Sequence, residues 1–456
     1  MAATRYALDD EPERWEPGKP LKLLLAGYCG TRNTGADVRV EEMIRQFRRI
    51  FTDDELQLSL LTIDPDLTAG YFRGVRQVVL PTIFHRFLYD EVPRHHGVVA
   101  CEGSMFKSKF ANALSTMMAG SLGLASVEGK LSVGYGAEAG HMDEGLTDFV
   151  RSQLQDSLII CRNEPSRDIL EGMGVRTLGG TDTAWTFEPA NEDRGKQILM
   201  ERGWDGKQPV VVMCPINPFW WPAKPDLIKT AAYRLGGQFG AEHYKDIVFH
   251  QWSEDASQRY DDYIGGLAKA LTVFVKERGA FPLLAGSEQL DRHACEDVAA
   301  RVPFDVDLFV SDEYDMYDFV SVLRQASLMV SSRYHAIVYT MAAGVPSVGV
   351  TMDERIHNLL NDRGHQELLM RVDSDNLGDR VLTAMRTAHD ERERISQEVR
   401  AFVPGQIRMM GQMGMDFEDE VLRVYPDFPR RDVPRSWEHY VPELSPLLTK
   451  LVETHA

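Results

Sequence analysis

The stretch LMVSSRYHAIVYTMAAGVPSVGVT, residues 328–351, decides the fold. It opens and closes on short apolar runs, LMVS and SVGVT, of the kind that form buried parallel strands. Between them lies a helical run in which Ala342, Ala343 and Gly344 allow close packing on a sheet, and Pro346 ends this run. The order strand, helix, strand predicts one βαβ unit of a parallel sheet.

The same alternation extends over most of the chain and falls into two sets. The first set has predicted strands at 21–26, 56–63, 97–101, 131–134 and 158–161, and a predicted helix at 37–51. The second set follows a polar stretch at 188–203, with predicted strands at 208–214, 280–285, 306–310, 328–331 and 347–351, and predicted helices at 258–278, 288–301 and 316–325. Two such sets predict an α/β protein with two Rossmann-like doubly wound domains.

The domain organisation follows from these sets and from a helical C-terminal region. We expect helices at 376–403 and 406–424 to cross back over the first domain. Two Rossmann-like domains facing a cleft form the glycosyltransferase-B (GT-B) architecture, where ligands bind at the carboxyl ends of the strands. The predicted boundaries are a polar N-terminal tail at 1–20, an N-terminal Rossmann-like domain at 21–190, a C-terminal one at 204–375, and C-terminal helices at 376–456.

Length and charge limit the possible functions. The 456 residues are enough for two domains of about 150 to 200 residues each. The 50 basic and 69 acidic side chains give a formal net charge of -19. Because the sequence has no basic stripe, it would repel a polyanion such as nucleic acid. We therefore expect small-molecule substrates and no nucleic-acid partner.

The cysteines and the apolar runs bear on the compartment. Five cysteines lie far apart without a CxxC pair, which predicts reduced thiols and neither a disulfide framework nor a zinc site. The N-terminus lacks the apolar segment of a signal peptide. No run approaches the roughly 18 apolar residues of a transmembrane helix. We expect a cytoplasmic protein, with peripheral membrane association and the oligomeric state left open.

Arg333 and His335 stand at the junction between the strand 328–331 and the helix that follows. Arginine offers a planar fork that suits a carboxylate or a phosphate, and histidine is the natural proton-transfer group near neutral pH. We predict that both are catalytic, Arg333 by binding an anion and His335 by moving a proton. The alternative is structural, with Arg333 capping a helix and His335 buried in the core.

A glycine-bearing loop, GYCGTRNTGAD at residues 27–37, follows the first strand and opens a helix. Glycines let a backbone turn tightly and present N–H groups to an anion. The loop has neither the Lys-Ser/Thr of a P-loop nor the G-x-G-x-x-G of a dinucleotide site, so neither an NTPase nor an NAD enzyme is indicated. The sequence predicts a loop facing the cleft with Gly30, Asn33, Gly35 and Asp37, or else a structural turn.

Four shorter features are also open to interpretation. INPFWWP, residues 216–222, includes Asn217 and Trp220 and could form either a stacking platform for a sugar or a plug at a domain interface. Ser287 is expected to cap a helix that starts in GSEQLD, residues 286–291. DPD at 64–66 is interpreted as a proline turn and not as a metal site. His95 and His96 lack ligand partners at metal spacing and are interpreted as surface or loop residues, so no metal is predicted.

Three segments resemble the polysaccharide pyruvyl transferase family. They are GYCGTRNTGAD near the start, CRNEPSRDILEGMGV at 161–175, and SSRYHAIVYTMAAGVPSVGVTMDERIHNLL at 331–360, with S-x-R-x-H-A the most specific part. The resemblance covers roughly 21–360. It implies transfer of an enolpyruvyl unit from phosphoenolpyruvate to a sugar, giving a pyruvate ketal, on a GT-B-like fold without an obligatory metal. It gives Arg333 the donor-anchoring role, His335 the acid/base role and Arg162 a second anion contact.

Two segments depart from the family pattern. Family members commonly carry N-x-G-D-E where this chain has NTGAD at 33–37, and G-G-G-S where it has Cys101-Glu102-Gly103-Ser104. The acceptor is therefore expected to be atypical. Asp37 and Glu102 are candidates for deprotonating the acceptor hydroxyl, and Ser104 and Ser332 complete the predicted substrate-binding set.

The predicted function is pyruvyl transfer from phosphoenolpyruvate to a sugar or glycan-like acceptor, with release of phosphate, as in polysaccharide biosynthesis for a cell envelope. Phosphoenolpyruvate is the donor substrate, and no cofactor is expected. Two alternatives remain open: a GT-B glycosyltransferase that uses a nucleotide sugar, and a non-catalytic binding protein derived from the family.

Overall fold

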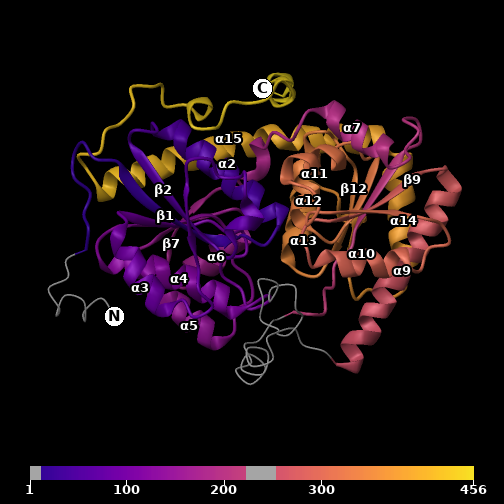
Figure 1. Ribbon diagram of the computed structural model, residues 1–456, viewed down its shortest axis with the longest axis horizontal. Helices are drawn as coiled ribbons and strands as arrows, with labels where there is room; N and C mark the ends of the chain where they lie inside the picture. Colours follow the sequence, from indigo (N-terminus) through magenta and orange to yellow (C-terminus); the bar gives the residue numbers. More distant parts are fainter. Residues whose placement is uncertain (1–11, 222–252, 456) are drawn as a thin grey trace. The chain divides into compact units, whose positions relative to one another are not determined.

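The computed structural model describes residues 12–221 and 253–455 (Figure 1). The chain forms two compact units. Unit 1 takes Met1–Thr31, Ala36–Thr186 and Gly405–Leu444, and unit 2 takes Arg32–Gly35, Phe187–Pro404 and Ser445–Ala456. The short segment Arg32–Gly35 therefore makes its contacts in unit 2, although the chain on both sides of it belongs to unit 1.

Unit 1 is built on a seven-stranded parallel sheet with the order β3-β2-β1-β4-β5-β6-β7. The central strand β1 pairs on one side with β2 and on the other with β4, so that Leu23 lies beside both Leu58 and Gly97. The side chains of Leu23 and Leu24 are fully buried, because both faces of the sheet are covered by helices. The strands are β1 Leu21–Cys29, β2 Leu56–Thr62, β3 Arg76–Val79, β4 Gly97–Ala100, β5 Leu131–Ala137, β6 Leu158–Cys161 and β7 Arg176–Gly179.

The helices of unit 1 pack on this sheet (Figure 1). Phe47 of the first helix stacks on Phe417 of the last long helix, with ring centroids 4.3 Å apart. In the segment predicted as a polar tail, Trp15 is buried and packs on Tyr425 and Phe428. The helices are α2 Thr34–Ile50, α3 His85–Glu91, α4 Asn112–Val127, α5 Glu144–Gln153, α6 Glu164–Glu171 and the second part of α15 Arg392–Val424, with 3-10 turns η1 Pro65–Thr68, η2 Val92–Arg94, η3 Ala184–Thr186 and η6 Trp437–His439.

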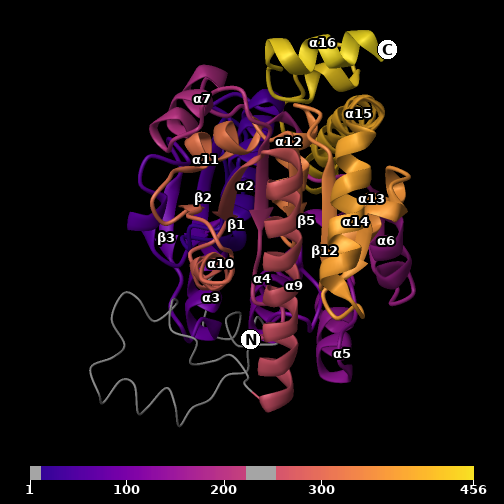
Figure 2. The ribbon, with the colours of Figure 1, turned by 90° about the vertical axis from the view of Figure 1, so that its right-hand side faces the viewer.

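Unit 2 is built on a six-stranded parallel sheet with the order β10-β9-β8-β11-β12-β13. Two of its helices, α9 and α14, lie side by side (Figure 2). They approach closely at Gly266 and Gly378, where a Cβ on Gly266 would lie 3.0 Å from the Gly378 nitrogen. The strands are β8 Val210–Cys214, β9 Phe281–Gly286, β10 Asp307–Val310, β11 Leu328–Ser331, β12 Ser347–Thr351 and β13 Leu369–Arg371. The helices are α7 Glu192–Glu201, α9 Glu254–Arg278, α10 Asp291–Ala299, α11 Met316–Leu323, α12 Tyr334–Met341, α13 Glu354–Asp362, α14 Leu377–Asp390 and α16 Pro446–Thr454, with the turn η5 Gln366–Leu368.

The predicted fold class is confirmed: both units are doubly wound α/β structures with parallel sheets. Each predicted strand is present, but β3, β7 and β13 were not predicted. All three lie at sheet edges and are partly exposed, so they lack the continuous apolar run that marks a buried strand.

The helical C-terminal region is divided differently from the prediction. A break was expected near residue 404, but α15 runs through Pro404 to Val424, and the break comes earlier, between α14 and α15. Proline removes one backbone hydrogen bond of a helix, and here the helix continues past that loss. The boundary between the two units falls at Pro404 and Gly405, inside α15.

The five cysteines are free and buried. Burial raises the pKa of each thiol, to about 12 for Cys161 and Cys214. No helix in the described ranges is long and apolar enough to cross a membrane.

Candidate functional site

Two of the predicted catalytic residues, Arg333 and His335, lie at the carboxyl edge of the unit 2 sheet, where β11 passes into α12. Arg333 occupies the N-cap position with an extended backbone, φ -104° and ψ 118°. Ser331 fixes the turn, because its hydroxyl accepts from the backbone nitrogen of Arg333 at 3.0 Å and donates to the backbone carbonyl of Arg333 at 2.8 Å. In a parallel sheet this edge is where ligands bind.

The guanidinium of Arg333 is held by two buried carboxylates. Its Nε lies 2.9 Å from Oδ2 of Asp291, and its Nη2 lies 2.7 Å from Oε2 of Glu288. Both carboxylates follow β9, which shares the carboxyl edge with β11. Among the described residues, no hydrogen bond engages Nη1 of Arg333. The Nε and Nη2 edge is therefore occupied inside the protein, and Nη1 is the nitrogen left for a ligand.

Two acids for one base make this cluster electrostatically unusual. Burial is the main cause that raises the pKa of Asp291 to about 6, against the opposing effect of Arg333. The Asp291 carboxylate also accepts from the backbone nitrogen of Glu288 at 3.1 Å. The prediction that Ser287 caps this helix is wrong: α10 begins at Asp291 with Leu290 at its N-cap.

His335 lies on the first turn of α12, where it meets the segment Arg32–Gly35. A Cβ built on Gly35 would lie 2.3 Å from Nδ1 of His335. The Thr34 nitrogen donates to the Ser287 carbonyl at 2.8 Å, and the Ser311 hydroxyl donates to the Arg32 carbonyl at 2.6 Å. The structure thus brings Gly35 of the glycine-bearing loop to the S-x-R-x-H motif, and it places half-buried Asn33 in the same segment.

The other predicted residues of unit 2 have structural contacts. Ser332 is buried, and its hydroxyl shares a 2.9 Å hydrogen bond with Tyr263, which also accepts from the Ile216 nitrogen. Asn217 accepts from the Phe219 nitrogen at 3.0 Å and so forms a local turn. Trp220 is only 4% exposed, so its ring has little open face for a sugar.

Unit 1 holds a buried network of charges at the carboxyl edge of its own sheet. Arg162, directly after β6, is bonded through Nε and Nη2 to Glu138 and through Nη1 to Asp182 at 2.9 Å. All of its guanidinium nitrogens are therefore hydrogen-bonded to carboxylates. In this structure the contacts of Arg162 are thus structural ones, to other side chains of unit 1. Lys107 pairs with Glu138 at 3.2 Å.

Arg39 is the member of this network that the sequence analysis missed. Its side chain is 1% exposed and pairs with Asp182 at 3.1 Å. It also donates to the carbonyls of Cys101 and Gly136, at 3.1 and 2.9 Å, and so joins the ends of β4 and β5. A signal was present in the sequence. Arg39, Glu42 and Gln46 form a polar stripe at helical spacing, and all three are buried.

The loop 101–104 lies against this network. A Cβ on Gly103 would lie 2.5 Å from Nη1 of Arg162, and Ser104 is buried. Glu102 is half-buried and accepts from the Gly103 nitrogen at 2.8 Å. The structure therefore brings the loop that carries Glu102 and Ser104 to Arg162 through Gly103.

The remaining two candidates of the first loop also belong to unit 1. Gly30 has φ +81°, and a Cβ there would lie 2.3 Å from Oγ1 of Thr62, so the turn itself requires glycine. Asp37 is buried in the first turn of α2, where the helix dipole favours a carboxylate.

The predictions for the DPD segment and for the two adjacent histidines had different outcomes. In the described ranges no three His, Cys, Asp or Glu side chains are grouped to hold a metal ion. Asp64 caps the turn η1 by accepting from the Asp66 nitrogen at 2.9 Å, which confirms the proline turn. His95 and His96 lie in the short loop between η2 and β4, so the loop interpretation holds, but they are not surface residues, because both are 2% exposed. Each follows a helical turn and precedes β4, where the chain enters the core.

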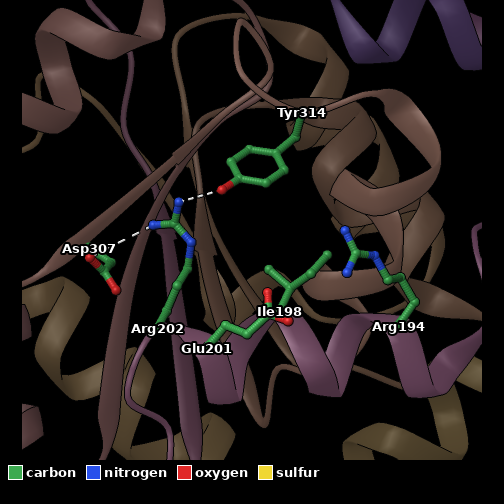
Figure 3. A pocket seen from close by; sticks show the side chains of 6 residues that line it. All are labelled: Arg194, Ile198, Glu201, Arg202, Asp307 and Tyr314. Carbon is green, nitrogen blue, oxygen red and sulfur yellow. Dashed lines mark hydrogen bonds and ion pairs between the residues drawn. The ribbon is translucent and has the colours of Figure 1, made fainter.

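A surface hollow of about 680 Å³ lies beside α7 in unit 2, and no predicted site residue lines it (Figure 3). Arg202 points toward Asp307 and Tyr314, and it donates to the Leu308 carbonyl at 3.1 Å. Arg194 is paired with Asp318 at 3.0 Å. Both arginines that line the hollow are therefore paired with protein groups, and the hollow does not form an anion site.

Solved structures of the same fold define the class of protein as GT-B-like. HepE of Anabaena, in complex with UDP-glucose, matches with a TM-score of 0.53 and 10% identity, over 89% of this chain and 98% of the other. A Listeria monocytogenes protein described as a UDP-N-acetylglucosamine 2-epimerase matches with a TM-score of 0.53 and 10% identity, over 88% and 97%. UGT89C1 of Arabidopsis thaliana, complexed with UDP, matches with a TM-score of 0.51 and 9% identity, over 90% and 100%. At these identities the likeness shows the fold alone.

A family model agrees with the resemblance found in the sequence. Residues 129–354 match the family model described as polysaccharide pyruvyl transferase, a range that includes Arg162, Arg333 and His335. This match confirms the resemblance to the polysaccharide pyruvyl transferase family found in the sequence, and it supports a transferase. No curated protein matches the sequence.

Proposed function

We propose that this protein transfers the pyruvate unit of phosphoenolpyruvate to two hydroxyls of a sugar or glycan-like acceptor. The observation that carries the proposal is the S-x-R-x-H segment, which lies inside the family match and at the carboxyl edge of a parallel sheet. An arginine and a histidine at this edge supply the two functions that the donor needs, an anion contact and a proton.

The reaction requires no oxidant or reductant. C3 of phosphoenolpyruvate gains a proton, which makes C2 electrophilic, and an acceptor hydroxyl forms a bond to C2. Phosphate then leaves as its C–O bond breaks, and a second hydroxyl bonds to C2 to close the ketal. Of the two protons lost by the hydroxyls, one balances the proton gained at C3 and the other leaves with phosphate.

His335 is the proposed donor of the proton to C3. Its place on the first turn of α12, two residues after Arg333, keeps a proton carrier next to an anion contact. Arg333 would meet the carboxylate or the phosphate of the donor through Nη1, while Asp291 and Glu288 hold its other edge. The proposed contact uses one guanidinium nitrogen, whereas the sequence suggested that the planar fork would bind the anion through two.

Arg162 has a proposed indirect role. Its ion pairs with Glu138 and Asp182 hold it beneath Gly103, so it would support the loop that carries Glu102 and Ser104. Glu102 is the proposed acceptor-side group of that loop, and Asp37 the alternative. The substitution of glutamate for a glycine of the family pattern supports an acceptor outside the usual range.

The direct test uses the full chain with phosphoenolpyruvate and a panel of glycosides that offer neighbouring hydroxyl pairs. We expect acceptor-dependent release of phosphate and a product with the mass of a pyruvate ketal. His335→Ala should abolish both, whereas His357→Ala, which removes an exposed histidine of the same unit, should change neither. Ketal formation at the full rate by the His335 variant would refute the mechanism.

A nucleotide-sugar glycosyltransferase is the second candidate, because two neighbours of the same fold are complexes with UDP-glucose and UDP. The two candidates differ in the ligand that stabilises the folded chain. Thermal stabilisation by UDP-sugars, together with no phosphate release from phosphoenolpyruvate on any acceptor, would favour this alternative and exclude pyruvyl transfer.

A further inference from the structure

We infer that Gly35 is a positioning residue for His335: the backbone of the segment Arg32–Gly35 forms the wall against which the imidazole rests. The inference rests on the proposed role of His335 as proton carrier. It gives a specific role to a residue near the start of the chain, outside the family match at 129–354.

The first step is that the segment is firmly seated in unit 2. The Thr34 nitrogen donates to the Ser287 carbonyl at 2.8 Å, and the Ser311 hydroxyl donates to the Arg32 carbonyl at 2.6 Å. Ser287 follows β9 and Ser311 follows β10, which are paired neighbours in the sheet. Two hydrogen bonds from adjacent strand ends thus hold the segment, and Thr34 is 2% exposed.

The second step is the contact itself. The three atoms nearest to a Cβ built on Gly35 all belong to His335: Nδ1 at 2.3 Å, Cγ at 2.7 Å and Cβ at 2.9 Å. Real Cβ atoms essentially never lie within 3.0 Å of another heavy atom. Rotation of the His335 side chain would move Nδ1 and Cγ but not Cβ, so the ring and the backbone must both shift to admit a methyl group.

The third step is that no other reason requires glycine here. The backbone of Gly35 does not have a positive φ, unlike that of Gly30 in the same loop. Helical geometry at the start of α2 also favours alanine over glycine by about 1 kcal/mol. Space for His335 is therefore the physical reason for a glycine at this position.

The consequence for catalysis is geometric. Proton transfer requires the donor within hydrogen-bond reach of the reacting atom, and a displacement of about 1 Å costs roughly 100-fold in rate. The atoms nearest to a methyl group at position 35 belong to His335 and not to Arg333, the proposed donor contact. The methyl group should therefore lower kcat much more than it changes KM for phosphoenolpyruvate.

The chain offers a matched control in Gly145. Gly35 and Gly145 are each the second residue of a helix, α2 and α5 respectively. A Cβ on Gly145 would lie no closer than 3.7 Å to its nearest neighbour, an oxygen of Asp143, which is an ordinary contact. Gly145→Ala therefore adds the same methyl group at the same helical position without touching His335.

The test follows the imidazole signals of the full chain, labelled at Cε1 of histidine, by NMR, with His335→Gln to assign the His335 signal. We expect Gly35→Ala to move the His335 signal and to lower kcat about 100-fold, with KM for phosphoenolpyruvate within about twofold. Gly145→Ala should do neither. A folded Gly35→Ala protein with the His335 signal in its original place would overturn the inference.

A second variant covers the case in which Gly35→Ala does not fold. Ser311→Ala removes the hydrogen bond to the Arg32 carbonyl without adding an atom, and we expect it to shift the His335 signal in a folded protein. An unmoved signal in this variant would contradict the seating of the segment. The NMR readout does not depend on the reaction. If the wild-type protein forms no ketal but the His335 signal still shifts in Gly35→Ala, the proposed function is refuted and the positioning of His335 stands.

Discussion

Arg333 and Asp291 face each other through two guanidinium nitrogens and both carboxylate oxygens. Nε of Arg333 lies 3.1 Å from Oδ1 and 2.9 Å from Oδ2 of Asp291, and Nη2 is bonded to Oδ1. Glu288 adds a second carboxylate to the same nitrogen. The residue proposed to hold the donor is thus also the counter-ion of two buried acids, and a simple deletion of Arg333 changes two properties together.

Stability and activity should separate in a pair of variants. Arg333→Ala leaves both carboxylates buried without a counter-ion, and we expect the free energy of unfolding to fall by about 3 kcal/mol. The double variant Arg333→Ala/Asp291→Asn removes one of these charges and should regain part of that stability, yet remain inactive. Urea denaturation and phosphate release measure the two effects. Recovery of activity along with stability would mean that Arg333 acts only through its structural contacts.

Arg39 should be the more costly of two arginines on α2. Arg39→Ala removes a buried ion pair and hydrogen bonds to the carbonyls of two strand ends, and we expect a loss of about 4 kcal/mol. Arg48→Ala removes a partly exposed pair with Asp53 and should cost less than about 1 kcal/mol. Urea denaturation of both variants is the measurement, and equal losses would contradict the role of Arg39 in joining strand ends.

His96 should make stability depend on pH. Burial is the main cause that lowers its pKa to about 4, and its Nδ1 accepts from the backbone nitrogen of Lys22 at 3.0 Å. Because the unfolded chain binds the proton more readily, the contribution of His96 is complete above about pH 6.5 and is lost as the pH falls to about 4.

The variant His96→Asn keeps an acceptor near the position of Nδ1 but does not titrate. The difference in unfolding free energy between wild type and this variant should change by on the order of 2 kcal/mol between pH 6.5 and pH 4. Melting curves across this range would show the change. Parallel pH profiles for the two proteins would argue against a neutral, buried His96.

Removal of the hydroxyl should affect activity at Tyr263 but not at Tyr260, although both tyrosines lie on α9. Tyr263→Phe leaves the Ile216 nitrogen and the Ser332 hydroxyl without their buried partner, which should cost about 1 to 2 kcal/mol and lower activity, because Ser332 precedes Arg333. Tyr260→Phe frees only Asp297, at a part-buried position, and should leave activity unchanged. An equal effect of both variants on activity would remove Tyr263 from the support of the site.

The strands that could be predicted from the sequence are those with continuous apolar runs. Strands such as Leu158–Cys161 and Leu328–Ser331 are buried on both faces, and their predicted bounds are those observed. The edge strand β7 has one apolar residue among RTLG and depends on pairing with β6, which no local pattern records. Pro404 led to the opposite error, a predicted helix break that is absent. The low helix propensity of proline favours a break there, but packing keeps α15 continuous.

The predicted part of the site was the part carried by one short segment. The sequence singled out Arg333 and His335 because a charged pair at a strand-to-helix junction is unusual in itself, and the structure places both at that junction. Asp291 and Glu288 could not be found in this way, since the sequence does not say which acids a distant arginine will meet. The contact between Gly35 and His335 joins residues 300 positions apart and required the three-dimensional structure.

The buried thiols have a practical consequence for the study of this enzyme. Thiolates, not thiols, attack alkylating reagents, so five buried cysteines with raised pKa values should be almost silent toward them in the folded chain. A cysteine introduced at an exposed position, such as that of Arg86 on α3 with its 80% exposed side chain, would be the one fast-reacting group. A fluorophore or spin label could then be attached at a chosen place without first replacing any native residue.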